Sequence, residues 1–136
     1  MTPTPPTDTR FLELVFPDQA NHYGTLFGGA ALSLMGKAAF IAATRRARSA
    51  VVMASSDKVD FHMPVRVGQL VELHALVTRV GRSSMTVAVE GFAEMLLTGQ
   101  RQLAMRGSFE MVAVDSEGRP IPVPAISPSF SEAMTT

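Results

Sequence analysis

The sequence contains no cysteine, and its 12 lysines and arginines are matched by 12 aspartates and glutamates. The absence of cysteine excludes a disulfide framework, a thiol nucleophile and a thiolate metal site, and it favours a reducing compartment. Balanced charge leaves no overall basic field to hold nucleic acid or an anionic membrane. We therefore expect no nucleic-acid partner and a cytoplasmic location.

A long apolar run is also missing. The longest stretch, 30–43, is interrupted by Ser33 and Lys37 and falls short of the ~20 residues that cross a bilayer. The first ten residues are rich in proline and threonine and do not resemble a signal peptide. We expect no membrane insertion, and the 136 residues suit a single domain.

The pattern along the chain divides it into an N-terminal arm at 1–10, a folded domain at 11–124 and a proline-rich flexible tail at 125–136. Within the domain, Ala, Leu and Met dominate 30–46 without proline, which predicts one mostly buried helix. Apolar and polar residues alternate in the remainder, which predicts strands. The expected strands are Phe11–Phe16, Val51–Phe61, Leu70–Val80, a segment around Met85–Val89, and Gln102–Val114.

One buried helix followed by long strands with hairpin-length connections indicates an α+β domain with an antiparallel sheet. Because the helix is apolar on nearly every face, the sheet should curl around it, which is the hot-dog architecture. The sequence gives little support to several other familiar chemistries. The segment Gly36-Lys37-Ala38 lacks the hydroxyl residue of a phosphate loop, and no dinucleotide or serine-hydrolase glycine motif occurs. The three histidines are too scattered to predict a metal site.

The most informative segment runs from Asn21 to Gly29, N-H-Y-G-T-L-F-G-G, and leads directly into the expected helix. One interpretation is a glycine-rich turn that lets the helix pack closely. The other is functional, since free backbone N–H groups at a helix N-terminus favour negative charge. A thioester carbonyl placed there would be polarised as in an oxyanion hole, and the Asn21 amide could hold the carbonyl or a water.

The string N-x-x-G-x-L-F-G-G before a helix resembles the hot-dog acyl-CoA thioesterases of the cytosolic acyl-CoA hydrolase type. Three further segments agree with that family in order and spacing, and the resemblance covers about residues 11–124. These segments are 54–68 (ASSDKVDFHMPVRVG), 80–85 (VGRSSM) and 109–124.

The resemblance implies a hydrolase that converts fatty acyl-CoA to free acid and CoA, assembled as a homodimer and commonly as a trimer of dimers. CoA is then part of the substrate, and no separate cofactor or metal is expected. By resemblance, Asn21 and Gly29 are catalytic, and the other site residues bind substrate. Those residues are Phe27, Gly28, Phe61, Arg82, Ser83 and Ser84. The last three also suit a simple hairpin turn, although an arginine there could pair with phosphate.

One departure from the family stands out. The family carries an acidic residue seven positions beyond its second helix-entrance glycine, and here that position is Gly36. No Asp or Glu occurs anywhere in 30–54. A general base contributes about 10²–10⁴-fold, so its loss predicts weak turnover unless another group substitutes. Ser33, Asp18 and an acid from a neighbouring subunit remain open as substitutes.

Two functions therefore stay open. The first is thioester hydrolysis with Asn21, the helix N-terminus and water. The alternative is a non-catalytic acyl-CoA-binding or regulatory hot-dog module that lost its acid at Gly36. A hot-dog hydratase is disfavoured, because no Asp/His pair lies at comparable spacing near the helix.

Overall fold

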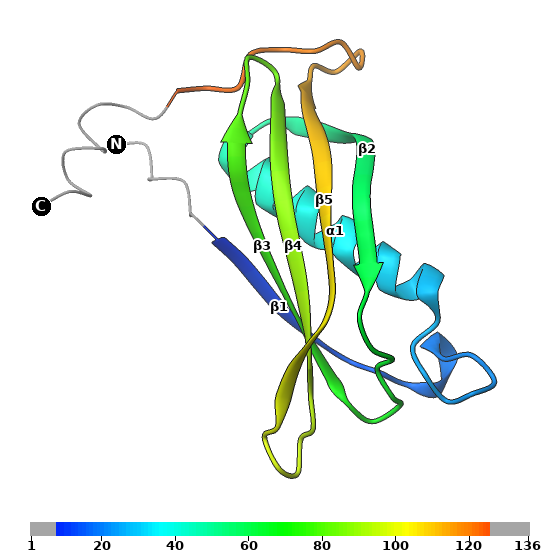
Figure 1. The fold of residues 1–136 in the computed structure, drawn as a ribbon. Helices are drawn as coiled ribbons and strands as arrows, with labels where there is room; N and C mark the ends of the chain where they lie inside the picture. Colours follow the sequence, from blue (N-terminus) through cyan, green and yellow to red (C-terminus); the bar gives the residue numbers. More distant parts are fainter. Residues whose placement is uncertain (1–7, 126–136) are drawn as a thin grey trace, which may run out of the picture.

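The computed structural model describes residues 8–125, so most of the expected arm and tail lies outside the described residues. Five strands and one long helix make up the domain, with a short 3₁₀ helix between the first strand and the long helix (Figure 1). Their bounds are β1 Asp8–Leu14, η1 Pro17–Gln19, α1 Gly28–Ala47, β2 Ala50–Phe61, β3 Leu70–Val80, β4 Ser84–Glu94 and β5 Arg101–Val114.

The five strands form a single antiparallel sheet in the order β1-β3-β4-β5-β2. Helix α1 runs across one face of this sheet, behind the strands as drawn in Figure 1. β3, β4 and β5 follow one another through hairpins, whereas β2 comes directly after the helix and joins the far edge beside β5. The α+β architecture and the hot-dog arrangement expected from the sequence are confirmed.

Helix α1 packs on the sheet through one face of mostly small residues. Met35, Ala38 and Ala39 are fully buried there, and alanines allow the sheet to come close to the helix backbone. The opposite face is open, because Leu32 and Phe40 are 42% and 46% exposed in the single chain. The helix is therefore half covered rather than buried all round. Within residues 8–125, no helix combines the length and hydropathy needed to span a membrane.

The first strand begins earlier than the sequence pattern suggests. β1 pairs with β3 from Asp8, opposite Leu76, to Leu14, opposite Leu70. The expected arm boundary at residue 10 therefore falls inside a strand. Backbone pairing with β3 holds residues 8–10 in the sheet, although these three residues are too polar to signal a strand.

The strand β2 lies at the edge of the sheet and is irregular. Its register against β5 shifts between Met53 and Ser55 and again between Asp57 and Asp60, and Lys58 within the second shift has a φ of 49°. Such bulges bend an edge strand and increase its twist. Only Val51 of β2 is fully buried, so the alternation expected from the sequence does not produce a regular buried face here.

Candidate active site at the N-terminus of the long helix

The loop that precedes α1 is a compact turn fixed by backbone hydrogen bonds. The Asn21 N–H donates to the Thr25 carbonyl at 2.9 Å, and Gly24 completes the turn with a φ of 78°, a conformation that favours glycine. The Leu26 N–H donates to the Val65 carbonyl at 2.7 Å, which ties the loop to the segment after β2. The helix entrance is therefore held in place from both sides.

The side chain of Asn21 has a fixed orientation. Its Oδ1 accepts hydrogen bonds from the Tyr23 N–H at 3.0 Å, the Thr25 N–H at 3.3 Å and the Thr25 hydroxyl at 3.1 Å. Because a backbone N–H can only donate, the oxygen and nitrogen of this amide cannot be exchanged. Among the described residues none accepts a hydrogen bond from Nδ2, so the amide offers a ligand two N–H donors.

The first turn of α1 is uncapped by side chains and open to ligands. Phe27 is the N-cap, with extended backbone and no side-chain capping bond, so the following N–H groups lack an intrahelical acceptor. A Cβ at Gly28 would meet no atom within 4 Å, whereas one at Gly29 would lie 3.0 Å from Cε1 of Phe27. Close packing under the Phe27 ring therefore accounts for Gly29, and the open space lies at Gly28.

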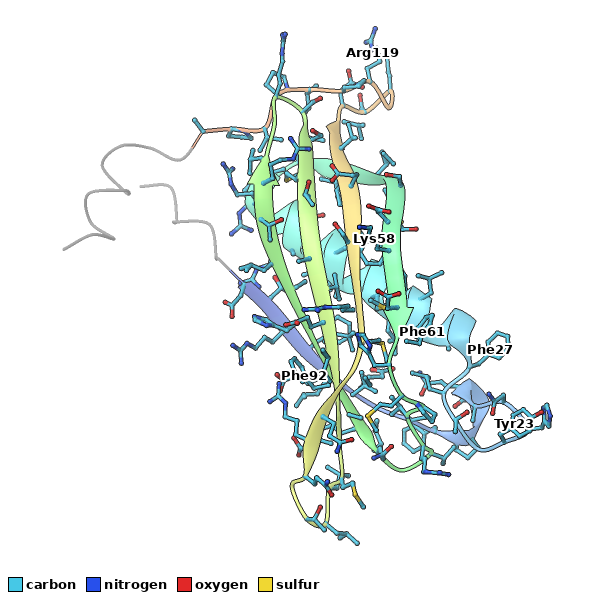
Figure 2. All side chains as sticks on the ribbon, viewed as in Figure 1. Tyr23, Phe27, Lys58, Phe61, Phe92 and Arg119 are labelled. Carbon is cyan, nitrogen blue, oxygen red and sulfur yellow. The ribbon has the colours of Figure 1, made fainter. Side chains whose placement is uncertain are left out.

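A cavity of about 350 Å³ borders the helix entrance. It is lined by Gly28 and Ala31 of the helix, by Phe61 at the end of β2, and by the following segment, which includes His62 and Val65. Figure 2 shows Phe27 and Phe61 at the same end of the molecule. This volume is in the range of small-ligand sites, and its mostly apolar lining suits an acyl chain.

The turn that contains Arg82, Ser83 and Ser84 lies at the other end of the sheet. The Arg82 carbonyl accepts the Val123 N–H at 2.7 Å, and the neighbouring Pro124 carbonyl accepts a hydrogen bond from Arg46, in the last turn of α1. A helix of 20 residues is about 30 Å long. One chain therefore does not bring the Arg82 turn together with the helix entrance.

Position 36 lies midway along α1 and carries no side chain. Gly36 is partly buried, and its nearest side-chain neighbour is Met53 of β2. Of the substitutes considered for the missing acid, Ser33 is an exposed residue of α1 and Asp18 an exposed residue of η1. Among residues 8–125, no group of three or more His, Cys, Asp or Glu side chains is arranged to hold a metal ion.

Sequence reasoning missed two features of the site. His62 lines the cavity beside the helix entrance, and its signal in the sequence was its position directly after Phe61. Met53 had no such signal, since only the pairing of β2 with β5 and the packing of α1 bring it against Gly36.

An exposed apolar surface runs along α1 and β2, and we call it the α1–β2 face. It consists of Leu32 and Phe40 from the helix and Met53 from the strand, which are 42–46% exposed in the single chain. Strand β2 also forms the edge of the sheet, so its outer backbone groups have no strand partner within the described chain.

Comparison with known proteins gives a consistent result. The sequence pattern of the thioesterase superfamily matches residues 23–98. An uncharacterised acyl-CoA thioester hydrolase of Bacillus subtilis is 44% identical over 118 residues, covering 87% of this chain and 69% of that protein. A hexameric acyl-CoA thioesterase, solved without ligand, is 42% identical with a TM-score of 0.86 and covers 98% of this chain and 86% of its own.

An acyl-CoA hydrolase from Staphylococcus aureus, solved with butyryl coenzyme A and coenzyme A, is 34% identical with a TM-score of 0.83. The match covers 89% of this chain and 74% of that enzyme. Three variants of the same enzyme have also been solved, in which an asparagine, an aspartate or a threonine is replaced by alanine.

Proposed function

Because the chain belongs to the thioesterase superfamily, we propose that it is an acyl-CoA thioester hydrolase whose reaction takes place at the N-terminus of α1. The observation that carries this proposal is the combination of an open helix entrance at Gly28, the free amide N–H groups of Asn21 and the adjoining apolar cavity. The hydrolase names of the relatives and the CoA-bound S. aureus structure support the same substrate class.

In the proposed reaction, the thioester carbonyl oxygen points at the free N–H groups of Gly28 and Gly29, where the helix dipole stabilises the negative charge of the tetrahedral intermediate. The acyl chain enters the cavity beside Phe61. Water attacks the carbonyl carbon and its proton passes to solvent. The C–S bond then breaks, and the departing thiolate takes a proton to give CoA and the free acid. Asn21 orients the carbonyl or the water through Nδ2.

We propose further that Gly36 stands where related enzymes have an acidic residue. Counted along the chain, the aspartate replaced in the S. aureus variant follows the replaced asparagine at the same separation at which Gly36 follows Asn21. Without a general base the attack loses a contribution of about 10²–10⁴-fold, so turnover should be slow. The same observation favours the alternative function, a module that binds acyl-CoA without hydrolysing it.

The active assembly in this proposal contains at least two copies of the chain. In one chain the Arg82 turn and the helix entrance lie at opposite ends, so one CoA can reach both only if a second copy supplies the turn. The α1–β2 face offers the apolar surface for that pairing, and a related thioesterase is hexameric. We propose a homodimer, assembled further into a trimer of dimers, in which Arg82, Ser83 and Ser84 contact the phosphates of CoA. A cytoplasmic location stays a prediction.

Thiol release from a panel of acyl-CoA esters, together with calorimetry of CoA binding, tests this function. We expect CoA to bind and thiol release to be saturable but slow, and we expect Asn21→Ala to abolish the release. His22→Ala is the matched control, since His22 is exposed in the same loop and its ring lies against that of Tyr23. Binding without any release would favour the non-catalytic module. No binding of CoA or of a long-chain acyl-CoA would exclude both functions.

A further inference from the structure

Gly36 and Met53 occupy adjoining positions on two different elements. Met53 pairs with Met111 of β5 in the sheet, and its terminal methyl group lies against the helix. A Cβ built at Gly36 would be 3.2 Å from Cε of Met53, its nearest contact outside the helix backbone. Figure 1 shows β2 at the edge of the sheet with α1 passing behind it. The methionine methyl group is therefore the first atom that a side chain at position 36 would meet.

The methyl group makes this space unsuitable for a carboxylate. A separation of 3.2 Å is tighter than ordinary van der Waals contact, and an aspartate would have to place three more heavy atoms beyond the Cβ. Methionine is flexible enough to move by a few tenths of an ångström, but it offers no hydrogen bond. An apolar neighbour disfavours the charged form of a carboxyl group.

The spacing of the S. aureus variants points to the same pair of positions. The threonine replaced in one variant follows the replaced aspartate at the same separation at which Met53 follows Gly36. On this count, Gly36 stands where that enzyme has a carboxyl group, and the thioether of Met53 stands where it has a hydroxyl group. Both polar groups are absent here, and a Cβ at the first position would lie 3.2 Å from the methyl group at the second.

We infer that Met53 determines the chemistry of position 36: its methyl group is the first atom that a side chain there would meet, so the two residues together keep the hydrolysis of acyl-CoA slow. This inference rests on the proposed function. If Met53 had only a packing role, a carboxylate introduced at position 36 would act as a base by itself. The inference requires instead that this carboxylate become an effective base only when Met53 is also replaced by a residue with a hydroxyl group.

A set of four proteins tests the inference: the wild type, Gly36→Asp, Met53→Thr and the double variant. The measurements are kcat and KM for thiol release from one acyl-CoA over a range of pH. We expect less than a tenfold increase in kcat for either single variant. In the double variant we expect kcat to rise toward the general-base contribution of about 10²–10⁴-fold, with an acid limb in its pH profile that the wild type lacks. An equal increase from Gly36→Asp alone would overturn the inference.

Val52→Thr combined with Gly36→Asp is the matched control. Val52 precedes Met53 on β2 and is similarly exposed, but successive side chains of a strand point to opposite sides. This control should behave like Gly36→Asp alone. If the double variant unfolds, Gly36→Asp with Met53→Ser provides a smaller replacement of the same chemistry.

The affinity for CoA distinguishes a failure of the role of Met53 from a failure of the proposed function. All four proteins should bind CoA with similar dissociation constants. A folded double variant that binds CoA but hydrolyses no faster than Gly36→Asp would overturn the role of Met53 and leave the proposed function intact. Failure of the wild type to bind CoA would overturn both.

Discussion

The side-chain oxygen of Asn21 accepts hydrogen bonds from both the N–H and the hydroxyl of Thr25, at 3.3 and 3.1 Å, which leaves only the amide nitrogen for a ligand. Asn21→Asp keeps the side-chain oxygen that accepts from Thr25 and removes the N–H groups that could donate to a ligand. We expect this variant to fold normally and to lose thiol release, whereas Asn21→Ala should also destabilise the loop by about 1 kcal/mol. Thermal unfolding and thiol release, measured on both variants, separate these effects. Full activity of a folded Asn21→Asp protein would exclude the amide N–H from the reaction.

Gly91 in β4 is packed tightly against β5. A Cβ at this position would lie 2.6 Å from Cγ of Met105 and 3.0 Å from its sulfur, inside the buried core. Gly91→Ala should therefore lower the free energy of unfolding by about 1–3 kcal/mol. Gly28→Ala is the control, because a Cβ there meets nothing within 4 Å. Equal denaturant midpoints for the two variants would contradict the packing described here.

A charge on the α1–β2 face should prevent assembly. Phe40→Lys places an ammonium group in the middle of the exposed apolar surface of α1, and its burial against a second copy without a partner would be costly. We expect light scattering to give a multiple of 14.6 kDa for the wild type and the monomer mass for Phe40→Lys. Leu97→Ser is the control, since Leu97 is fully exposed at the β4–β5 turn, away from this face. A wild type that stays monomeric would rule out the proposed shared site.

Arg82 should contribute to CoA affinity through the phosphates. It is exposed, and no acidic residue among 8–125 forms an ion pair with it. Arg82→Ala should weaken CoA binding by about tenfold or more, as expected for a hydrogen bond to a charged group, and should leave the weaker binding of pantetheine unchanged. Arg82→Lys should restore part of the affinity, since it keeps the charge but not the two-pronged geometry. Calorimetry with CoA and with pantetheine measures both affinities. An equal loss of affinity for the two ligands would indicate that Arg82 has a structural role.

The turn after β5 should be sensitive to acid. Backbone hydrogen bonding from the Arg119 N–H is the main cause that lowers the pKa of the Asp115 carboxyl below 3.8, with the Glu117 N–H and the Arg119 side chain adding to it. Because the pKa is lower in the folded state, this stabilisation is present above pH 3.8 and is lost as the pH falls below it.

Asp115→Asn should accordingly lower the thermal midpoint at pH 6, and the difference from the wild type should shrink as the pH is brought below 3.8. Thermal unfolding of both proteins between pH 6 and pH 2.5 measures this. Glu117→Gln in the same turn is the control for the loss of one carboxylate charge, because Glu117 also forms an ion pair with Arg119 but accepts no backbone N–H in the turn. A difference that stays constant with pH would mean that the charge of Asp115 is not responsible.

Much of the fold follows from local patterns. Leu70–Val80 is predicted at its observed bounds, because its inward and outward residues alternate with the period of two that a half-buried strand imposes. The long helix is likewise predicted to within two residues at its start, because a run without proline that is rich in good helix formers favours a helix over other local structures. The glycine-rich entrance at Gly28 is visible for the same reason, as a local signal.

The remaining features depend on contacts between distant segments. The sequence by itself determined one helix, the strands of an antiparallel sheet, an open helix entrance beside Asn21 and the absence of an acid at Gly36. Only the tertiary structure decided that Met53 lies against Gly36, that Phe61 borders the cavity and that the Arg82 turn lies at the far end of the sheet. The physical reason is that strand register and the crossing of helix and sheet are set by packing over the whole chain, which leaves no periodicity within any single segment.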